Sequence, residues 1–166
     1  ERGEIWHEEG KMLNKKNTFE DYISAAKFLI EKKYTYKGGI VGYGGSAGGL
    51  LLGAVVNQVP ELFLGMVIQV GFLDSLTTNT DHSLPLSLGE LTEFGDGKGN
   101  PDHFKYLKSY SPYHNIKQMD YPNLLLVTNL KDVRVLFDEP TKFTAKLRQY
   151  KTDKNLLLLK CELEDA

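Results

Sequence analysis

A serine enclosed by glycines is the residue of this sequence best suited to nucleophilic chemistry. It lies in the segment Gly44-Gly45-Ser46-Ala47-Gly48, which has the form G-x-S-x-G. That pattern presents a serine hydroxyl on a sharp turn between a strand and a helix, where larger neighbouring side chains would clash. The helix that starts there directs backbone N–H groups outward, so we expect the N–H of Ala47 to bind a developing oxyanion. The segment predicts a nucleophile elbow with Ser46 as the nucleophile.

The same turn also fits a dinucleotide-binding fingerprint. Gly42, Gly44 and Ala47 match the pattern G-x-G-x-x-G/A. That interpretation requires a carboxylate at the end of the second strand, about 20 residues further on. No acid occurs there before Asp74, and the turn contains no lysine of the kind a phosphate loop uses. We favour the elbow over a dinucleotide site and over a purely structural glycine turn.

Asp132 is the candidate for the acid that would support the serine. In α/β-hydrolases the catalytic residues follow the chain order serine, acid, histidine, and the acid lies in a loop after a later strand. Asp132 meets this condition because it follows the apolar run at 124–128. Asp120 and Asp138 are alternatives by proximity alone, with ordinary surface-charge roles as their simpler interpretation.

No histidine occupies the expected position of the general base. The four histidines are His7, His82, His103 and His114, and all of them precede Asp132. Without an imidazole to accept its proton, the serine hydroxyl is a weak nucleophile at neutral pH, so we expect negligible hydrolysis by this chain alone. His82, His103 and His114 lack metal-binding spacing such as H-E-x-x-H, and we expect them on the surface or in turns, with no metal site, whereas His7 is expected to be a packing residue.

The predicted elements bring the serine and the aspartate to one edge of a sheet. Short apolar runs predict strands at 40–43, 66–70, 123–128 and 156–161. Helical spacing predicts helices at 17–30, starting with a cap at Asn17 or Thr18, and at 47–58 and 139–150. This alternation predicts an α/β fold with a mostly parallel sheet and helices on both faces. Residues 1–16 are expected to be irregular. Segment 71–118 is expected to be a long functional loop at the carboxyl edge.

Composition narrows the class of protein. The chain has 166 residues, 41% hydrophobic and 25% charged, so we expect one folded domain rather than disorder. Its 20 basic and 22 acidic residues are interspersed, which predicts neither nucleic acid nor an anionic membrane as a partner. The apolar runs are too short to span a bilayer, and no secretion signal follows the first residues. A single cysteine, Cys161, expected to pack in the last strand, fits a reducing, cytoplasmic compartment.

Ordered motifs along almost the whole chain resemble the catalytic domain of the prolyl oligopeptidase family of serine peptidases. The resemblance is strongest to the oligopeptidase B branch of that family. It rests on the segments 3–7, 16–21, 45–51, 85–90, 110–116, 121–123 and 132–135. Several independent matches in the same order are more specific than G-x-S-x-G alone. The last segment agrees with Asp132 as the acid.

The resemblance implies an α/β-hydrolase-type domain that residues 1–166 cover only in part, incomplete at both ends. In the family, an N-terminal β-propeller, the first strands of the sheet and a loop with the second oxyanion donor precede this part. The last strand then leads into a Gly-His pair that supplies the base. We therefore expect the chain to be a fragment or the product of a split gene, with the missing segments of its parent as partners.

The resemblance also implies a substrate class. Oligopeptidase B cleaves short peptides after Arg or Lys, and Glu90 is then the residue that binds the cation, since a carboxylate pairs bidentately with a guanidinium. The family commonly has a second acid two positions on, where this sequence has Thr92, so the pair is incomplete. Glu93 is interpreted as a structural or surface acid, and no cofactor is implied. Two alternatives remain: a non-catalytic remnant, and a small-ester hydrolase on the same fold.

Overall fold

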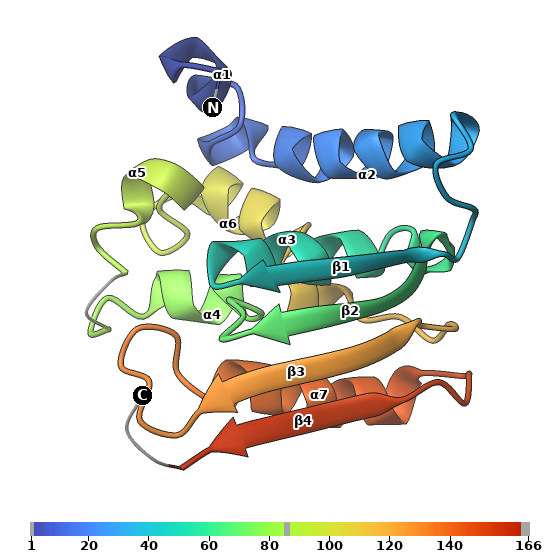
Figure 1. Ribbon diagram of the computed structural model, residues 1–166. Coiled ribbons are helices and arrows are strands. Elements are labelled where there is room, and N and C mark those ends of the chain that lie inside the picture. Colours follow the sequence, from blue (N-terminus) through green and yellow to red (C-terminus); the bar gives the residue numbers. More distant parts are fainter. Residues whose placement is uncertain (1, 85–86, 164–166) are drawn as a thin grey trace.

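Four parallel strands form the sheet of this computed structural model, which describes residues 2–84 and 87–163 (Figure 1). The strands are β1 (Ile40–Gly45), β2 (Phe63–Gln69), β3 (Asn123–Asn129) and β4 (Leu157–Glu162). They lie in the sheet in the order β1-β2-β3-β4, and each neighbouring pair is parallel. The predicted parallel sheet and its four predicted strands are confirmed, with β2 beginning at Phe63 rather than Met66.

Three long helices, all predicted from the sequence, accompany the strands. They are α2 (Lys16–Glu31), α3 (Ala47–Val56) and α7 (Asp138–Tyr150). Figure 1 shows α3 and α7 behind the sheet, and α2 packs against α3. Leu50, Val55 and Val56 of α3 are fully buried. A helix that is apolar on all sides is stable in this position because the sheet and α2 enclose it.

Segment 71–118 is not the long loop predicted from the sequence. It contains the helices α4 (Ser75–Thr80), α5 (Leu91–Phe94) and α6 (Pro101–Lys108), and the 3-10 helix η3 (Pro112–Asn115). These elements are too short for a period of 3.6 residues to become visible in the sequence. Side-chain caps define two of them: Asp74 accepts the Thr77 amide before α4, and Asn100 accepts the Asp102 amide before α6.

The N-terminal segment, predicted to be irregular, also contains short elements. They are α1 (Glu4–Glu8) and the 3-10 helix η1 (Met12–Asn14); a further 3-10 helix, η2 (Pro60–Leu62), precedes β2. The predicted cap of α2 is wrong, because α2 begins at Lys16 without a side-chain cap. The side chains of Asn17 and Thr18 instead donate to the backbone carbonyls of residues 9 and 10. They tie the N-terminal segment to the first turn of α2.

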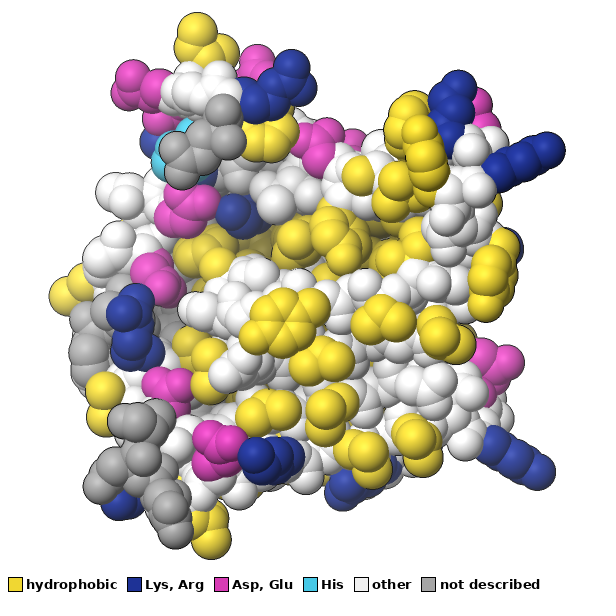
Figure 2. Space-filling model, in the orientation of Figure 1, with side chains coloured by type: hydrophobic (Ala, Val, Ile, Leu, Met, Phe, Trp, Pro, Cys, Tyr) yellow, Lys and Arg dark blue, Asp and Glu magenta, His cyan; other side chains and the backbone are white. Residues whose placement is uncertain are grey.

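The sheet has one buried and one exposed face. Met66 of β2 and Leu124 of β3 are register partners on the buried face, beneath the helices. On the other face, the register aligns a row of apolar side chains across the four strands: Tyr43, Val67, Leu125 and Leu158. Tyr43 is 70% exposed, and Figure 2 shows hydrophobic side chains spread over this face. Helices were predicted on both faces of the sheet, but within the described residues they cover only one face.

Two further observations concern the expectations from composition. No helix within residues 2–84 and 87–163 is long and apolar enough to cross a membrane. Within the same ranges, no group of three or more His, Cys, Asp or Glu side chains is placed to hold a metal ion. Cys161 lies in β4, the last strand, as predicted, and is partly exposed.

Candidate active site

The predicted strand, turn and helix around Ser46 are present. β1 ends at Gly45, α3 begins at Ala47, and Ser46 between them has φ 53° and ψ −118°. A positive φ is unfavourable for a residue with a side chain, and such strain concentrates at functional turns. The Ser46 N–H donates to the Gln69 carbonyl (3.0 Å), and the Ser46 carbonyl accepts from the Phe72 N–H (3.1 Å). These two bonds fix the strained turn to the end of β2.

Two glycines of the turn are required by close backbone approach. A Cβ on Gly44 would lie 2.6 Å from the Gly48 carbonyl oxygen in the first turn of α3. A Cβ on Gly49 would lie 2.4 Å from the Gly71 Cα, which follows β2. At Gly48, by contrast, nothing lies within 4 Å of an added Cβ. The glycines at 44 and 49 therefore let α3 start close to the strands, so that Ser46 stands at their carboxyl edge.

We expect Gly49→Ala to destabilise the chain and Gly48→Ala not to. The added methyl group at position 49 forces α3 away from Gly71, and overpacking of this kind costs about 1–3 kcal/mol. At position 48 the methyl group meets open space, and alanine favours a helix over glycine by up to about 1 kcal/mol. Urea unfolding of the two variants measures the difference. Equal midpoints would contradict the close contact between α3 and the chain after β2.

A small cavity lies beside Ser46. Its volume is about 40 Å³. Ser46 and Ala47 of the elbow line one side, and Arg134 and Val135 of the loop after β3 line another. The remaining lining residues all come from segment 71–118: Phe72, Thr78, Leu84, Ser87, Glu90 and Phe94. Of the residues predicted from the sequence, the structure thus brings Ser46, Ala47 and Glu90 to one cavity.

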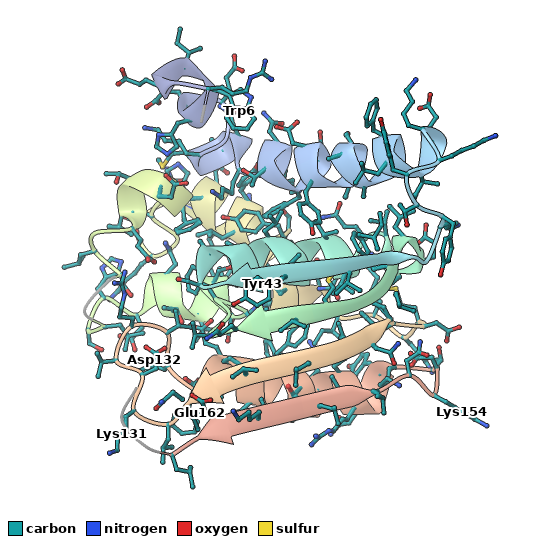
Figure 3. All side chains as sticks on the ribbon, viewed as in Figure 1. Trp6, Tyr43, Lys131, Asp132, Lys154 and Glu162 are labelled. Atoms are coloured by element: carbon teal, nitrogen blue, oxygen red, sulfur yellow. The ribbon has the colours of Figure 1, made fainter. Side chains whose placement is uncertain are left out.

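Asp132 lies in the loop that contributes Arg134 and Val135 to this cavity. Its Oδ1 accepts the backbone N–H of Arg134 (2.8 Å) and that of Val135 (3.1 Å), which shapes the loop after β3. Figure 3 shows Asp132 beyond the carboxyl end of the strands. Because β1 and β3 are parallel, the chain segments that follow them emerge at the same edge. The predicted acid and the predicted nucleophile are therefore on the same edge of the sheet.

The alternative acids have other positions or other partners. Asp120 precedes β3 and so belongs to the opposite edge of the sheet, where it accepts a hydrogen bond from the Thr152 hydroxyl. Asp138 is the first residue of α7, and its carboxylate is 3.0 Å from the Lys142 Nζ. The geometry favours Asp132 over both.

The four histidines face groups outside the cavity. His7 Nε2 lies 2.8 Å from a Glu93 oxygen, and His103 Nδ1 accepts the Asp96 N–H (3.0 Å). His82 Nε2 lies 3.8 Å from Asp96 Oδ1, and His114 contacts Ser111 and Asp74. His82 lies in a turn, as predicted, whereas His103 lies in α6 and His114 in η3, and both are partly exposed. Among the described residues, no histidine lines the cavity beside Ser46.

Ser111, His114 and Asp74 have the residue types of a catalytic triad but not its geometry. The same ring atom, His114 Nδ1, faces both the Ser111 Oγ (3.1 Å) and Asp74 Oδ1 (3.4 Å). A triad requires the two ring nitrogens to serve different partners. Ser111 is also fully buried, and its Oγ accepts the Leu76 N–H. This group is structural.

Glu90 is a partly buried carboxylate with a cation nearby. It precedes the first residue of α5 and lines the cavity together with Arg134. Burial raises the pKa of the Glu90 carboxyl above its ordinary value, and the charge of Arg134 opposes that rise. A carboxylate in this setting attracts a second cation more strongly than one in open water would.

Sequence reasoning missed Arg134 and the aromatic wall of the cavity. Arg134 follows Asp132 by two residues, and this position in the loop of the predicted acid could have indicated that it lies near the site. Phe72 and Phe94 have ring centroids 5.5 Å apart. Phe94 lies one helical turn after Glu90, but Phe72 is distant in sequence, and no spacing predicts that the two rings meet.

Glu93 has the structural role predicted for it. Its two oxygens lie 2.8 Å from His7 Nε2 and 2.9 Å from Lys15 Nζ. These hydrogen bonds lower its pKa even though burial alone would raise it. Glu93 borders a larger cavity of about 740 Å³ beside α1 and α2, which contains neither Ser46 nor Asp132. Although this cavity is larger than the one beside Ser46, it does not contain the residues proposed for the chemistry.

The fold and the site together define the class of protein. A parallel sheet, a serine at a strained strand-to-helix turn and an acid after a later strand of the same edge are the features of an α/β-hydrolase. The chain belongs to the prolyl oligopeptidase family, whose model matches residues 1–165. The resemblance drawn from the sequence motifs is confirmed.

Similar proteins are longer than this chain. Protease 2 of Moraxella lacunata is 48% identical over 163 residues, which cover 98% of this chain and 24% of that protein. Oligopeptidase B from Leishmania major superposes with a TM-score of 0.91 at 43% identity, covering 93% of this chain and 21% of that one. Oligopeptidase B from Trypanosoma brucei with covalently bound antipain superposes with a TM-score of 0.92 at 44% identity, covering 95% of this chain and 22% of that one. The chain thus spans less than a quarter of the length of each.

Proposed function

We propose that this chain forms the nucleophile-bearing part of a serine peptidase catalytic domain. The observation that carries the proposal is the position of Ser46, on a positive-φ turn that lines a cavity together with Arg134 and Val135 of the loop that also contains Asp132. Membership of a peptidase family supports this interpretation over a dinucleotide site. β2 also ends at Gln69, so no carboxylate stands where a ribose would require one.

The proposed reaction is acyl transfer through Ser46. Its Oγ attacks the carbonyl carbon of the scissile peptide bond while a base takes the hydroxyl proton. The N–H of Ala47, at the start of α3, donates to the oxyanion. The C–N bond then breaks, the leaving amine receives the proton from the base, and the acyl group stays on Ser46 until water releases it. Asp132 orients the base and stabilises its charged form.

The base in this proposal is a histidine outside these 166 residues. His7, His103 and His114 are engaged with Glu93, the Asp96 N–H, and the pair Ser111 and Asp74, respectively. His82 Nε2 is buried and lies nearest to Asp96. The relatives extend well beyond the part that this chain matches. A segment of a longer parent protein can therefore supply the imidazole.

The proposed substrates are short peptides with Arg or Lys at the cleaved bond. Glu90 is the carboxylate that would receive the cation, and Arg134 is the positive charge that faces it when no substrate is bound. The cavity, at about 40 Å³, is smaller than an arginine side chain. The substrate cation is therefore expected to take the place of Arg134 beside Glu90, with Arg134 turning towards the peptide backbone.

The decisive experiment compares the purified chain with its Ser46→Ala variant on a fluorogenic Arg peptide. Alone, the two are expected to be indistinguishable, because no histidine is placed to activate Ser46. After refolding with the segments of a longer parent that supply the histidine, the parental sequence should gain activity and Ser46→Ala should not. Turnover by the 166-residue chain itself, abolished by Ser46→Ala, would contradict the need for an outside base. No activity even with the added segments would favour a non-catalytic remnant. Cleavage of simple esters with no cleavage of any peptide would instead favour an esterase.

A further inference from the structure

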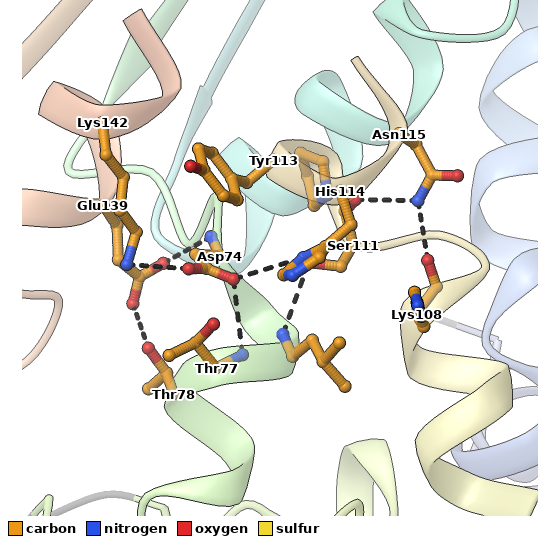
Figure 4. A network of polar contacts seen from close by, with 12 residues as sticks. Asp74, Thr77, Thr78, Lys108, Ser111, Tyr113, His114, Asn115, Glu139 and Lys142 are labelled. Carbon is orange, nitrogen blue, oxygen red and sulfur yellow. Dashed lines mark hydrogen bonds and ion pairs between the residues drawn. The ribbon is translucent and has the colours of Figure 1, made fainter. Parts of the chain in front are cut away.

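A buried polar cluster joins α4 to α7 (Figure 4). Its two carboxylates, Asp74 and Glu139, are each only 2% exposed. Asp74 caps the start of α4, and Glu139 is the second residue of α7. Carboxylates are rarely buried this deeply unless they are paired and hydrogen-bonded. The cluster therefore has a specific arrangement, which we call the α4–α7 clamp.

Glu139 makes two of the bonds that cross from α7 to α4, and Lys142 of α7 makes a third, to the Asp74 carboxylate. Its Oε2 accepts the backbone N–H of Asp74 (2.7 Å), and its Oε1 accepts the Thr78 hydroxyl (2.6 Å). One carboxylate thus holds two points of α4, its N-terminal cap and its middle. Both distances are at the short end for hydrogen bonds, as is usual for bonds to a charged acceptor.

Lys142 holds the second carboxylate of the clamp. Its Nζ lies 2.7 Å from Asp74 Oδ2 and 3.0 Å from Asp138 Oδ2, and these bonds raise the Lys142 pKa although burial alone would lower it. Asp74 Oδ1 also faces His114 Nδ1 at 3.4 Å. Glu139 has no cation of its own within this set. Burial raises its pKa to about 7, against the bonds from Thr78 and the Asp74 N–H, and the charge of Asp74 adds to the rise.

The clamp connects the two walls of the cavity beside Ser46. Thr78, which donates to Glu139, also lines the cavity. Its backbone carbonyl accepts a hydrogen bond from the hydroxyl of Ser87, a second lining residue (2.8 Å). On the other side, α7 begins directly after the loop that carries Asp132, Arg134 and Val135. A movement of Glu139 therefore changes the separation of these walls.

We propose that Glu139 is a positioning residue that fixes the acid loop against the substrate-facing segment by holding α4 to the start of α7. The consequence for catalysis rests on the proposed function, because it concerns the pair Asp132 and Ser46 and the site of Glu90. The clamp itself is a property of the fold and can be tested without any activity.

The first test measures amide hydrogen exchange in the 166-residue chain. Glu139→Ala leaves the Asp74 N–H without its acceptor, and we expect its exchange to accelerate about tenfold, the equivalent of one lost hydrogen bond. Exchange should also accelerate in residues 129–137, across the clamp. Glu139→Gln should restore both, because its carbonyl can accept the Asp74 N–H while the Thr78 hydroxyl turns to accept from its amide. Asp138→Ala is the matched control, because it removes a neighbouring carboxylate of the same helix turn and leaves the Glu139 bonds intact.

Thr78→Val keeps the test decisive if Glu139→Ala does not fold. It removes one donor with little change of shape, and it should accelerate exchange in residues 129–137 as well as in α4. Acceleration confined to the substituted helix, or an equal effect of Asp138→Ala, would overturn the proposal.

The second test titrates the chain with agmatine, a guanidinium probe, by NMR. The dissociation constant should rise several-fold in Glu139→Ala and return in Glu139→Gln. Unchanged binding in Glu139→Ala would overturn the positioning role. If the parental chain binds no agmatine, the assignment of Glu90 in the proposed function fails, and the exchange of residues 129–137 alone decides for or against the clamp.

Discussion

Asp132→Asn is expected to lower kcat/KM about 10⁴-fold in a form of the protein that contains the outside histidine. Asparagine presents an amide where the imidazole needs a carboxylate, so the ring adopts the wrong tautomer and its charged form loses its stabilising partner. The loop itself should persist, because the side-chain carbonyl oxygen of the introduced asparagine can still accept the N–H groups of Arg134 and Val135 that Asp132 Oδ1 accepts. The loss should therefore appear in kcat with little change in stability.

The structure offers matched controls for this substitution. Asp120→Asn changes an acid at the opposite edge of the sheet, and Asp138→Asn changes one that pairs with Lys142. Neither should change kcat by more than a small factor. If Asp138→Asn caused the large loss and Asp132→Asn did not, the catalytic acid would be Asp138, and the order inferred from the loop after β3 would be wrong.

Glu90→Gln, in the same longer form, should abolish the preference for basic substrates. The substitution removes one charge and keeps the shape of the side chain, so the cation of a bound Arg substrate loses its partner. Breaking a partly buried ion pair in this way costs about 2–5 kcal/mol. The ratio of kcat/KM for an Arg peptide to that for a neutral one measures the effect. The loss for Lys should be smaller, because an ammonium group makes no bidentate contact.

The burial of Glu90 adds a pH dependence to this prediction. Because its pKa is raised, the carboxylate is protonated at a higher pH than an exposed glutamate. The preference for Arg should therefore be present above that pKa and decline as the pH falls through it, and Glu90→Gln should lack this decline. Glu93→Gln is the control, since Glu93 is engaged by His7 and Lys15. Equal losses for Arg and neutral peptides in Glu90→Gln would make Glu90 structural.

The elements that position the site were predictable because their signals are local. β1, β2, β3 and β4 are apolar runs, and α2, α3 and α7 show helical spacing over ten or more residues. The turn at Ser46 was predictable because its glycines are adjacent in sequence. The short helices α4 and α5 carry no such period, and their limits depend on contacts such as the Asp74 cap.

The parts that were not predictable depend on residues far apart in the chain. Glu139 and Asp74 are separated by 65 positions, and their contact arises only when α7 packs against β3 and β4 and brings Glu139 to the chain that follows β2. The meeting of Phe72 with Phe94 is of the same kind. Helices were predicted on both faces because the strands are apolar on both sides. In the described structure one of these apolar faces is not covered by helices, and its side chains Tyr43 and Leu158 are half-exposed or more.

The order of the strands has a consequence for how the sheet is assembled. Each strand pairs with the one that precedes it in the chain, so β2 adds to β1, β3 to β2 and β4 to β3. Among the four strands that the structure describes, none has to be inserted between two that are already paired, and during synthesis these four can be added one after another at the same edge, in the direction in which the polypeptide is made. The turn of Ser46 depends on β1, α3 and the end of β2, all of which are synthesised before β3 and the loop of Asp132. In vectorial synthesis the nucleophile can therefore be in place before the acid that serves it.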